Sequence, residues 1–393
     1  MTRSTLQTNT QRRAYWVLVS YENVPGRSKH MKRHGNLFGK IIDIDNLYLA
    51  HKNARKGKSY YSDVRMVDSD LEHYLWQLHD SLRDHTFTTS PYTTKQIYEP
   101  KKRTIYKLPY FPDRIVHHAV MNVLQPIWDK TFIYDLYSAI PGKGLHAGSY
   151  RLRQFMRDRE STRYCLKYDI SKFYPSIDHD ILIEKIRKKI KCEDTLWLLE
   201  DVVRSPGENK NVPIGNYLSQ YFSNIYMSDF DHWIKEEKRM RYYIRYCDDG
   251  VILHRDRDTL QKLQVEIEEY LREELDLTLN PKTRVLDVDR QGIDFLGYRC
   301  FRDYTLLRKS SARRFKKKIK SIEKGNHDSQ NMISSIMSYL GWLRHCDSYH
   351  LQSSYVYDNP IILKKMDHAS MELGIENPLR KYNARKHNLS TRN

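Results

Sequence analysis

Residues 242–254 constrain the fold more than any other part of this sequence. They read YYIRYCDDGVILH, two stretches rich in aromatic and β-branched residues on either side of Asp-Asp-Gly. This pattern predicts a β-hairpin. Asp248 and Asp249 then lie at its tip, where like charges raise each other's pKa unless a cation lies between them. An Asp-Asp-Gly turn alone is most often only a hairpin, so other segments must decide whether it carries chemistry.

A second segment ends in another acidic residue. Residues 164–170, YCLKYDI, predict a strand that runs into a loop at Asp169. Two such strands side by side would bring Asp169 next to Asp248. Mg²⁺ prefers carboxylate oxygens together with substrate phosphates, and paired ions catalyse phosphoryl transfer. We therefore expect two Mg²⁺ ions, with Mn²⁺ as an alternative. The expected metal residues are Asp169, Ile170 and Asp248, and the expected catalytic residues are Asp169, Asp248 and Asp249.

Helical and strand patterns alternate along the middle of the chain. Asp178 is a predicted N-cap for a helix that carries Ile181, Leu182 and Ile186 at helical spacing. Two later amphipathic helices are predicted around residues 260–271 and 333–343. This mixed order favours an α+β fold over a regular βαβ array.

The overall charge favours a polyanionic partner. The chain has 393 residues, with 67 Lys and Arg against 49 Asp and Glu, a formal net charge of +18. Its thirty tyrosines suit base stacking, although tyrosine also fills half-buried positions in many proteins. No long apolar run or signal peptide is apparent, and the five cysteines form no CxxC pair. We therefore expect nucleic acid rather than a membrane as partner, and a cytoplasmic location.

Six segments, in order, resemble the reverse transcriptase family over about residues 36–350. The segment YDISKFYPSID resembles motif A, and YCDD fits the family's Y-x-D-D motif C. The other four are a fingers segment, motif B, the motif that follows YCDD and a primer-grip hairpin. They read PKKRTIYKLPYFPDRIVHHAV (100–120), IGNYLSQYFSNIYM (214–227), LNPKTRV (279–285) and IDFLGYRC (293–300).

The resemblance implies a nucleotide site. It places Tyr174 as a steric gate against the ribose 2′-hydroxyl and Lys282 near the triphosphate, where it is a candidate proton donor to pyrophosphate. Basic groups of the fingers segment would stabilise charge on the leaving group. The residues expected to bind deoxynucleotide are Arg103, Lys107, Tyr174, Gln220 and Lys282.

Nucleic-acid contacts are expected from motif B, motif C and a basic segment. Residues 309–320, KSSARRFKKKIK, hold seven basic residues in twelve positions and resemble a thumb that follows the duplex backbone. Gly142 and Gly144 suggest a loop near the template. The expected nucleic-acid-binding residues are Gly215, Asn216, Ser219, Tyr246, Arg313, Arg314, Lys317 and Trp342.

The family's right-hand fold of fingers, palm and thumb is the expected architecture, with an antiparallel palm sheet. We expect a basic N-terminal arm at 1–35, fingers and palm at 36–302, a helical thumb at 303–355 and a basic C-terminal extension at 356–393. Fewer than fifty residues follow this thumb, too few for an ordinary RNase H or endonuclease domain.

Motif B points to a subgroup. Residues 214–220 have the form I-G-x-x-x-S-Q, whereas intron-encoded and retron enzymes usually carry P-Q-G there. This form resembles diversity-generating retroelement and antiphage defence enzymes, and Cys247 departs from the Y-M-D-D of the former. The resemblance implies a structured noncoding template RNA, a cDNA product, dNTPs, and a small accessory protein or homo-oligomer. The cognate RNA, the priming mode, the fidelity and the choice between the two systems stay open.

Two other functions remain as alternatives. An RNA-dependent RNA polymerase shares a two-metal palm and would use ribonucleotides instead of deoxynucleotides. A basic RNA-binding module with a polymerase-like fold would keep its biological role after loss of Asp248. The choice of nucleotide and the effect of Asp248→Ala distinguish these alternatives from a reverse transcriptase.

Overall fold

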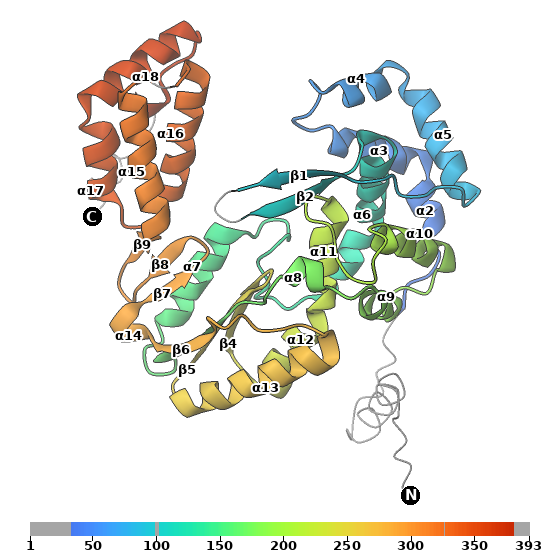
Figure 1. Ribbon diagram of the computed structural model, residues 1–393, viewed down its shortest axis with the longest axis horizontal. Coiled ribbons are helices and arrows are strands. Elements are labelled where there is room, and N and C mark those ends of the chain that lie inside the picture. The colour runs from blue at the N-terminus through green and yellow to red at the C-terminus, as the bar shows by residue number, and fades with distance from the viewer. Residues whose placement is uncertain (1–32, 99–101, 326, 381–393) are drawn as a thin grey trace, which may run out of the picture.

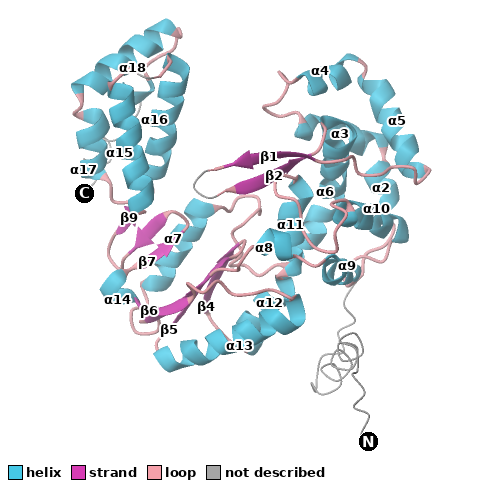
Figure 2. Cartoon of the chain, viewed as in Figure 1, coloured by secondary structure: helices cyan, strands magenta, loops and turns pink. Residues whose placement is uncertain are grey.

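The computed structural model describes residues 33–98, 102–325 and 327–380. Most of the expected N-terminal arm and residues 381–393 of the expected C-terminal extension lie outside the described residues. Three bodies are visible in Figure 1: a helical body with a projecting hairpin, a sheet flanked by helices, and a separate helical bundle. Figure 2 shows that strands concentrate in the middle body.

The fingers are helical apart from one hairpin. The helix α6 is apolar on most of its sides and is therefore buried, with α3 packed along it. The strands β1 and β2 are antiparallel and extend from this body. Its elements are α2 (Phe38–Ile42), α3 (Ile44–Ala54), α4 (Ser62–Ser69), α5 (Leu71–Arg83), β1 (Thr93–Ile97), β2 (Arg103–Lys107), η1 (Tyr110–Arg114) and α6 (Ile115–Trp128).

The palm contains a four-stranded antiparallel sheet in the order β4-β5-β3-β6. The long helix α13 packs on β3, β5 and β6, and α7 packs on β4. The palm and its flanking helices comprise η2 (Asp129–Thr131), α7 (Leu145–Met156), β3 (Tyr164–Tyr168), α8 (Phe173–Ser176), α9 (His179–Arg187), α10 (Glu193–Arg204), α11 (Tyr217–Tyr226), α12 (Ser228–His232), η3 (Trp233–Glu237), β4 (Tyr242–Tyr246), β5 (Asp249–His254), α13 (Arg257–Leu275) and β6 (Arg284–Asp287).

Both faces of this sheet are buried. Because side chains alternate along a strand, Leu166, Tyr168 and Ile252 join the core shared with the fingers. Their neighbours Cys165 and Val251 join a second core shared with the thumb. A strand buried on both faces reads as a continuous apolar run rather than as an alternating one. Val251, Ile252 and Leu253 of β5 form such a run, and the sheet lies between the two cores.

The thumb follows a small antiparallel sheet of β7, β8 and β9. Phe315 of α15 and Met366 of α18 are fully buried in the same core, and α18 packs against α16. The helical bundle therefore continues past residue 355, where the thumb was expected to end. Its elements are α14 (Val288–Gln291), β7 (Ile293–Phe295), β8 (Tyr298–Cys300), β9 (Thr305–Leu307), α15 (Lys309–Glu323), α16 (Ser329–Leu343), α17 (Tyr349–Gln352), η4 (Ser353–Tyr357) and α18 (Pro360–Glu372).

The α+β, right-hand architecture expected from the sequence is confirmed. The predicted hairpin is β4–β5, and the predicted cap is present, since the Asp178 carboxylate accepts a hydrogen bond from the Ile181 N–H at 3.1 Å. The predicted later helices are α13 and α16. Within the described ranges, no helix is long and apolar enough to cross a membrane.

Candidate active site

Two neighbouring strands bring the three predicted catalytic acids together. Asp169 directly follows β3, and Asp249 begins β5. The two strands pair with Tyr168 opposite Gly250, so Asp169 leaves the sheet beside the tip of the β4–β5 hairpin. Cys247 and Asp248 form that tip between Tyr246 and Asp249. The strand pairing thus places Asp169, Asp248 and Asp249 at one edge of the palm sheet.

Gly250 allows the sheet to close at this point. A Cβ atom added to Gly250 would lie 2.1 Å from the Cζ atom of Tyr168. The Tyr168 ring therefore lies directly over the glycine, and its hydroxyl is 2.8 Å from the hydroxyl of Tyr243. The glycine of Asp-Asp-Gly is required by this cross-strand contact as well as by the turn, a role that the sequence pattern did not indicate.

The hairpin tip is held from two sides. Cys247 has a positive φ of 52°, and its N–H donates to the Ser138 hydroxyl at 3.0 Å. The Ser138 hydroxyl in turn donates to the side-chain oxygen of Asn224 on α11, also at 3.0 Å. From the other side, Arg245 Nη1 donates to the Cys247 carbonyl at 2.8 Å. The backbone of the tip is therefore fixed independently of its acidic side chains.

The acids at the tip repel one another. Burial raises the pKa of Asp248 to about 6, and the charges of Asp249 and Asp169 act in the same direction. Arg103 of β2 opposes this shift, so its guanidinium lies within electrostatic range of Asp248. Burial also raises the pKa of Asp249, against the opposing charge of Lys167. A cation placed among these carboxylates would remove most of the repulsion.

Asn280 orients Asp169. Its side-chain amide donates to the Asp169 carboxylate at 2.9 Å, and its backbone N–H donates to the Asp169 carbonyl at 2.8 Å. The Ser171 N–H donates to the carbonyl of Thr278 on the same segment. Since peptide groups alternate in direction along an extended chain, the carbonyl of Ile170 points to the opposite side, that of β5. Asn280 was not among the expected site residues, although the Asn-Pro dipeptide at 280–281 marked a turn there.

The donor set fits a divalent ion that is shared with a substrate. Among the residues that the structure describes, no group of three or more His, Cys, Asp or Glu side chains is arranged to hold a metal by itself. Mg²⁺ in nucleotide enzymes usually binds one or two carboxylates and completes its shell with phosphates and water. The half-buried carboxylates of Asp169 and Asp248, neither of which forms an ion pair among the described residues, match that requirement together with the carbonyl of Ile170.

Tyr174 lies beside the hairpin tip. It belongs to α8, which begins after Lys172 at a positive φ of 46°. Its hydroxyl is 3.4 Å from the Ser223 hydroxyl of α11 and 3.9 Å from the Cys247 sulfur. Burial raises the pKa of Tyr174, and the same cause raises the pKa of the Cys247 thiol. The predicted gate is therefore a neutral, half-buried ring that contacts Cys247, the residue before Asp248, and the Cys247 thiol is a neutral group packed against it.

The other expected nucleotide-binding residues lie at different places around the acids. Lys107 is at the far end of β2 from Arg103, roughly 13 Å along an extended strand. Lys282 is exposed and donates its N–H to the Asn280 side chain, which also binds Asp169. Gln220 is exposed on α11, one turn before Ser223. Among the expected nucleotide-binding residues, Tyr174 contacts the hairpin tip at Cys247, and the charge of Arg103 acts on Asp248.

The motif B residues pack against β2. Gly215 has a φ of 120°, and an added Cβ would lie 2.7 Å from the carbonyl oxygen of Tyr106. The Tyr106 N–H donates to the Ile214 carbonyl at 2.9 Å, which ties the fingers hairpin to the start of α11. Asn216 is 9% exposed and Ser219 is 4% exposed, so little of either side chain is available to nucleic acid.

The thumb residues divide into two groups. Arg313, Arg314 and Lys317 are exposed on α15, opposite its buried apolar face. Trp342 instead packs at the junction with the palm, where an added Cβ on Gly297 would lie 2.6 Å from its ring. Tyr246 is likewise half-buried against the second core. At the expected template loop, Gly142 and Gly144 have positive φ values, but nothing in the described residues lies within 4 Å of an added Cβ at either.

Three known proteins illustrate what this chain is similar to. Protein YkfC of Escherichia coli (strain K12) is 23% identical over 258 residues, which cover 54% of this chain and 68% of YkfC. Group II intron-encoded protein LtrA of Lactococcus lactis is 25% identical over 218 residues, 51% of this chain and 35% of LtrA. An apo telomerase structure from Candida tropicalis, truncated from its C-terminal domain, has a TM-score of 0.44 at 16% identity and covers 60% of each chain.

The chain thus spans about two-thirds of YkfC but only about one-third of LtrA. Residues 94–300 match the family "Reverse transcriptase (RNA-dependent DNA polymerase)", and this match covers more than half of the chain. It includes β2, the three acids, Tyr174, the whole of α11 and the hairpin β7–β8. The chain therefore belongs to the reverse transcriptase family.

Proposed function

We propose that this protein is an RNA-directed DNA polymerase that copies a dedicated noncoding RNA into cDNA. The observation that carries the proposal is the group of Asp169, Asp248 and Asp249 at one sheet edge, with a raised pKa at Asp248 and Arg103 within electrostatic range. A cluster of buried acids without paired cations is costly unless the function requires it. Phosphoryl transfer is a function that does.

Asp169 and Asp248, with the carbonyl of Ile170, would hold two Mg²⁺ ions, and Mn²⁺ is the alternative metal. When bound, such ions activate the attacking 3′-hydroxyl and neutralise the triphosphate. The Asn280 amide keeps the Asp169 carboxylate in one orientation, and the hydrogen bonds to Cys247 keep the tip of the hairpin in place. Asp249 adds negative charge to the same edge.

Basic residues opposite the acids would bind the nucleotide. Arg103 is placed to stabilise charge that develops on the leaving pyrophosphate. Lys282, fixed through Asn280 next to Asp169, is the candidate proton donor to pyrophosphate. Lys107 and Gln220 lie on elements that border the same space, and we assign them supporting contacts to the nucleotide or template.

Tyr174 would select deoxynucleotides. Its ring is held between α11 and Cys247, so a ribose 2′-hydroxyl would meet a side chain that has little room to move. A fixed side chain in this position excludes ribonucleotides by steric overlap and leaves the binding of deoxynucleotides nearly unchanged. This observation favours DNA synthesis over the alternative of an RNA-dependent RNA polymerase.

The exposed basic face of α15 would follow the backbone of the primer–template duplex. Arg313, Arg314 and Lys317 can contact phosphates without reading sequence. Binding through this helix should therefore weaken steeply as salt rises. Trp342 and Tyr246 would contribute indirectly, by holding the thumb against the palm at their junction.

For the biological context, we propose a diversity-generating retroelement or an antiphage defence system. The support is the I-G-x-x-x-S-Q form of residues 214–220 in motif B. Either system would supply a structured RNA, and a small accessory protein or a second copy of the chain is a candidate partner. The five cysteines are free, which is consistent with the proposed cytoplasmic location.

Primer extension tests the chemistry. Purified protein would be given a primed RNA template with Mg²⁺ and either dNTPs or rNTPs, beside Asp248→Ala/Asp249→Ala. We expect DNA synthesis by the wild type and none by the variant. A product made from rNTPs alone would instead identify an RNA polymerase, and RNA binding without any wild-type product would favour a binding module.

Sequencing of the nucleic acid that copurifies with each protein tests the context. DNA complementary to one bound RNA, absent from Asp248→Ala/Asp249→Ala, would identify the template. Substitutions concentrated at template adenines would assign the protein to a mutagenic retroelement, and faithful copies would assign it to defence. Copurified RNA with no DNA sensitive to the mutations would contradict synthesis on that RNA.

A further inference from the structure

Exposed apolar side chains concentrate on the outer part of the fingers. Within residues 48–76, six large hydrophobic side chains are at least 38% exposed, in α3, α4, α5 and the loop after α3. A concentration of exposed apolar side chains often marks an interaction site. The six are Tyr48, Leu49, Tyr60, Tyr61, Met66 and Trp76.

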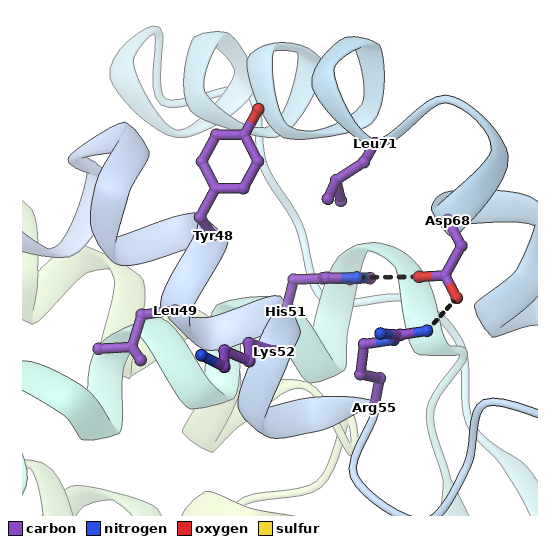
Figure 3. A pocket seen from close by; sticks show the side chains of 7 residues that line it. All are labelled: Tyr48, Leu49, His51, Lys52, Arg55, Asp68 and Leu71. Atoms are coloured by element: carbon purple, nitrogen blue, oxygen red, sulfur yellow. Dashed lines mark hydrogen bonds and ion pairs between the residues drawn. The ribbon is translucent and has the colours of Figure 1, made fainter.

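Part of this surface is an open pocket of about 570 Å³ between α3, α4 and α5. Tyr48, Leu49 and Lys52 of α3 contribute exposed side chains to it, and the Arg55 and Asp68 side chains are 40% and 27% exposed. Figure 3 shows His51 and Arg55 both pointing toward Asp68, with the Tyr48 ring nearby. The volume is within the range of pockets that bind small molecules or single nucleotides.

A fixed polar network forms the floor of the pocket. The Asp68 carboxylate lies 3.0 Å from His51 Nε2 and 2.6 Å from Arg55 Nη2. His51 is 4% exposed, and its Nδ1 is 2.9 Å from the Tyr110 hydroxyl. The Asp68 carboxylate and the His51 ring already have partners, whereas the Arg55 Nε atom is buried without a hydrogen-bond partner among the described residues. The network offers a ligand preformed donors and acceptors beside an aromatic ring.

Lys52 and Arg55 are basic residues of the pocket lining, and the loop that follows α3 adds Lys56 and Lys58. Residues 51–61, HKNARKGKSYY, contain four Lys and Arg and no acidic residue. In the part of the chain that the structure describes, Arg55 is paired with Asp68, whereas Lys52 and Lys58 form no ion pair. The same loop exposes Tyr60 and Tyr61, whose ring centroids are 4.4 Å apart. Unpaired lysines next to exposed tyrosines favour single-stranded nucleic acid over a protein partner.

The pocket is separate from the catalytic acids. The helix α3 packs on α6, and α6 packs on α11, which contacts the hairpin tip through Asn224 and Ser138. Figure 1 shows α3, α4 and α5 on the far side of α6 from β4 and β5. With helices about 8–10 Å apart, the pocket is on the order of 20 Å from the acids. A nucleotide in this pocket would not be the one that is copied.

We propose that this pocket binds an unpaired nucleotide of the RNA partner, outside the copied stretch, with the base against Tyr48 and a neighbouring phosphate on Lys52. The surface would anchor a structured RNA to the fingers while the palm copies another part of it. This inference rests on the proposed function in so far as the partner is RNA.

The test compares two double variants. Tyr48→Ala/Lys52→Ser removes one exposed tyrosine and one exposed lysine from the pocket. Lys262→Ser/Tyr304→Ala removes the same two residue types from exposed positions on α13 and in the β8–β9 turn, as a matched control. Two probes are used: a labelled RNA of about 40 nucleotides with single-stranded ends, and a short primer–template whose overhang is about 3 nucleotides.

We expect the pocket variant to bind the long RNA about tenfold more weakly by fluorescence anisotropy, since one stacked base and one phosphate contact are lost. Its slope of log affinity against log salt should fall by about one. Extension of the short primer–template should equal that of the wild type. The control variant should match the wild type with both probes.

Other outcomes would overturn the inference. Wild-type affinity of the pocket variant for the long RNA would exclude RNA as the ligand of this surface. An equal loss with both probes would show that the pocket is not separate from the catalytic channel. Because binding is measured without nucleotides, failure of the wild type to extend either probe would count against the proposed polymerase and not against the pocket.

Discussion

Two acidic sites lie near the end of β4 and differ in their electrostatics: Asp231 of α12, which pairs with Arg245 of β4, and Asp248 in the hairpin tip just beyond β4. Asp231 and Arg245 are both fully buried and form two hydrogen bonds, of 2.7 and 2.6 Å, with Tyr243 adding a third bond to the carboxylate. Asp248, three residues beyond Arg245, is surrounded by other carboxylates, and its pKa is raised.

These two aspartates show how a structural carboxylate differs from a candidate functional one. The Asp231 carboxylate has its charge and its hydrogen bonds satisfied, so it contributes to the unique packing of β4 against α12. The carboxylate of Asp248 is destabilising in the metal-free protein. Arg245 also donates to the Cys247 carbonyl, so the Asp231–Arg245 pair holds the backbone next to Asp248 in position. Unpaired buried acids are thus the better indicator of function.

The largest expected effect is that of Asp248→Asn. DNA synthesis should fall to background, while the metal-free protein should become more stable at pH 7, by about 2 to 3 kcal/mol. The wild-type carboxyl titrates at about 6 in the folded state, above its ordinary value of 3.8. The ionised carboxylate therefore lowers the stability of the folded protein above pH 6, and this loss of stability disappears as the pH falls toward 4. Urea unfolding of the wild type and the variant, with a chelator, at pH 7 and pH 4 measures this difference. A variant less stable than the wild type at pH 7 would mean that the Asp248 carboxylate is paired.

Arg245→Met should have the opposite effect on stability. It leaves the Asp231 carboxylate buried without a cation, which typically costs about 3–5 kcal/mol. The free energy of unfolding would be measured by urea titration at pH 7. The double variant Asp231→Leu/Arg245→Met should recover much of the loss, because no charge then remains buried. A double variant as unstable as the single one would mean that packing, not charge, determines the effect.

Gly250→Ala should have an intermediate effect. The new methyl group would overlap the Tyr168 ring, and overpacking of this kind costs about 1–3 kcal/mol. If β5 moves away from Tyr168 to make room, Asp248 and Asp249 move with it. DNA synthesis should therefore be lost to a larger extent than the change in unfolding free energy alone would cause. Tyr168→Leu in the same chain should restore part of the stability. An unchanged melting temperature for Gly250→Ala alone would contradict the close contact.

The smallest effect concerns a pair of histidines at the palm–thumb junction. The rings of His146 and His345 stack with centroids 3.9 Å apart, and burial lowers the pKa of each. Their folded pKa values lie below the ordinary 6.5, so stability should be lost as the pH falls below about 6.5, the opposite of the trend expected from Asp248. His345→Gln should flatten this loss in thermal unfolding between about pH 7.5 and 5.5. An equally steep loss in the variant would exclude the pair.

The local elements of the site were predictable, and their contacts were not. The hairpin β4–β5, the strand before Asp169 and the cap at Asp178 follow from short-range patterns, which the structure confirms. Asn280 and Ser138, which hold the acids and the tip, come from segments more than 100 residues away from their partners. No periodicity connects residues at that separation. The Arg within the apolar run YYIRY was the one local sign of a buried ion pair.

The thumb also shows that local patterns do not reveal contacts between distant segments. The amphipathic pattern of α16 was visible, but α18 was placed in a basic extension, because the hydrophobic pattern after residue 355 is weak. Ile362 and Met366 become core residues only through their contact with α15 and α16.

The sequence by itself determined the family, the order of the elements and the identity of the acids, because turns, caps and hydrophobic periods act over a few residues. The tertiary structure alone decided which acid bears the electrostatic cost, which arginine is neutralised and where the exposed aromatic pocket lies. Those properties depend on burial and on distances between segments far apart in the chain, which only folding brings together.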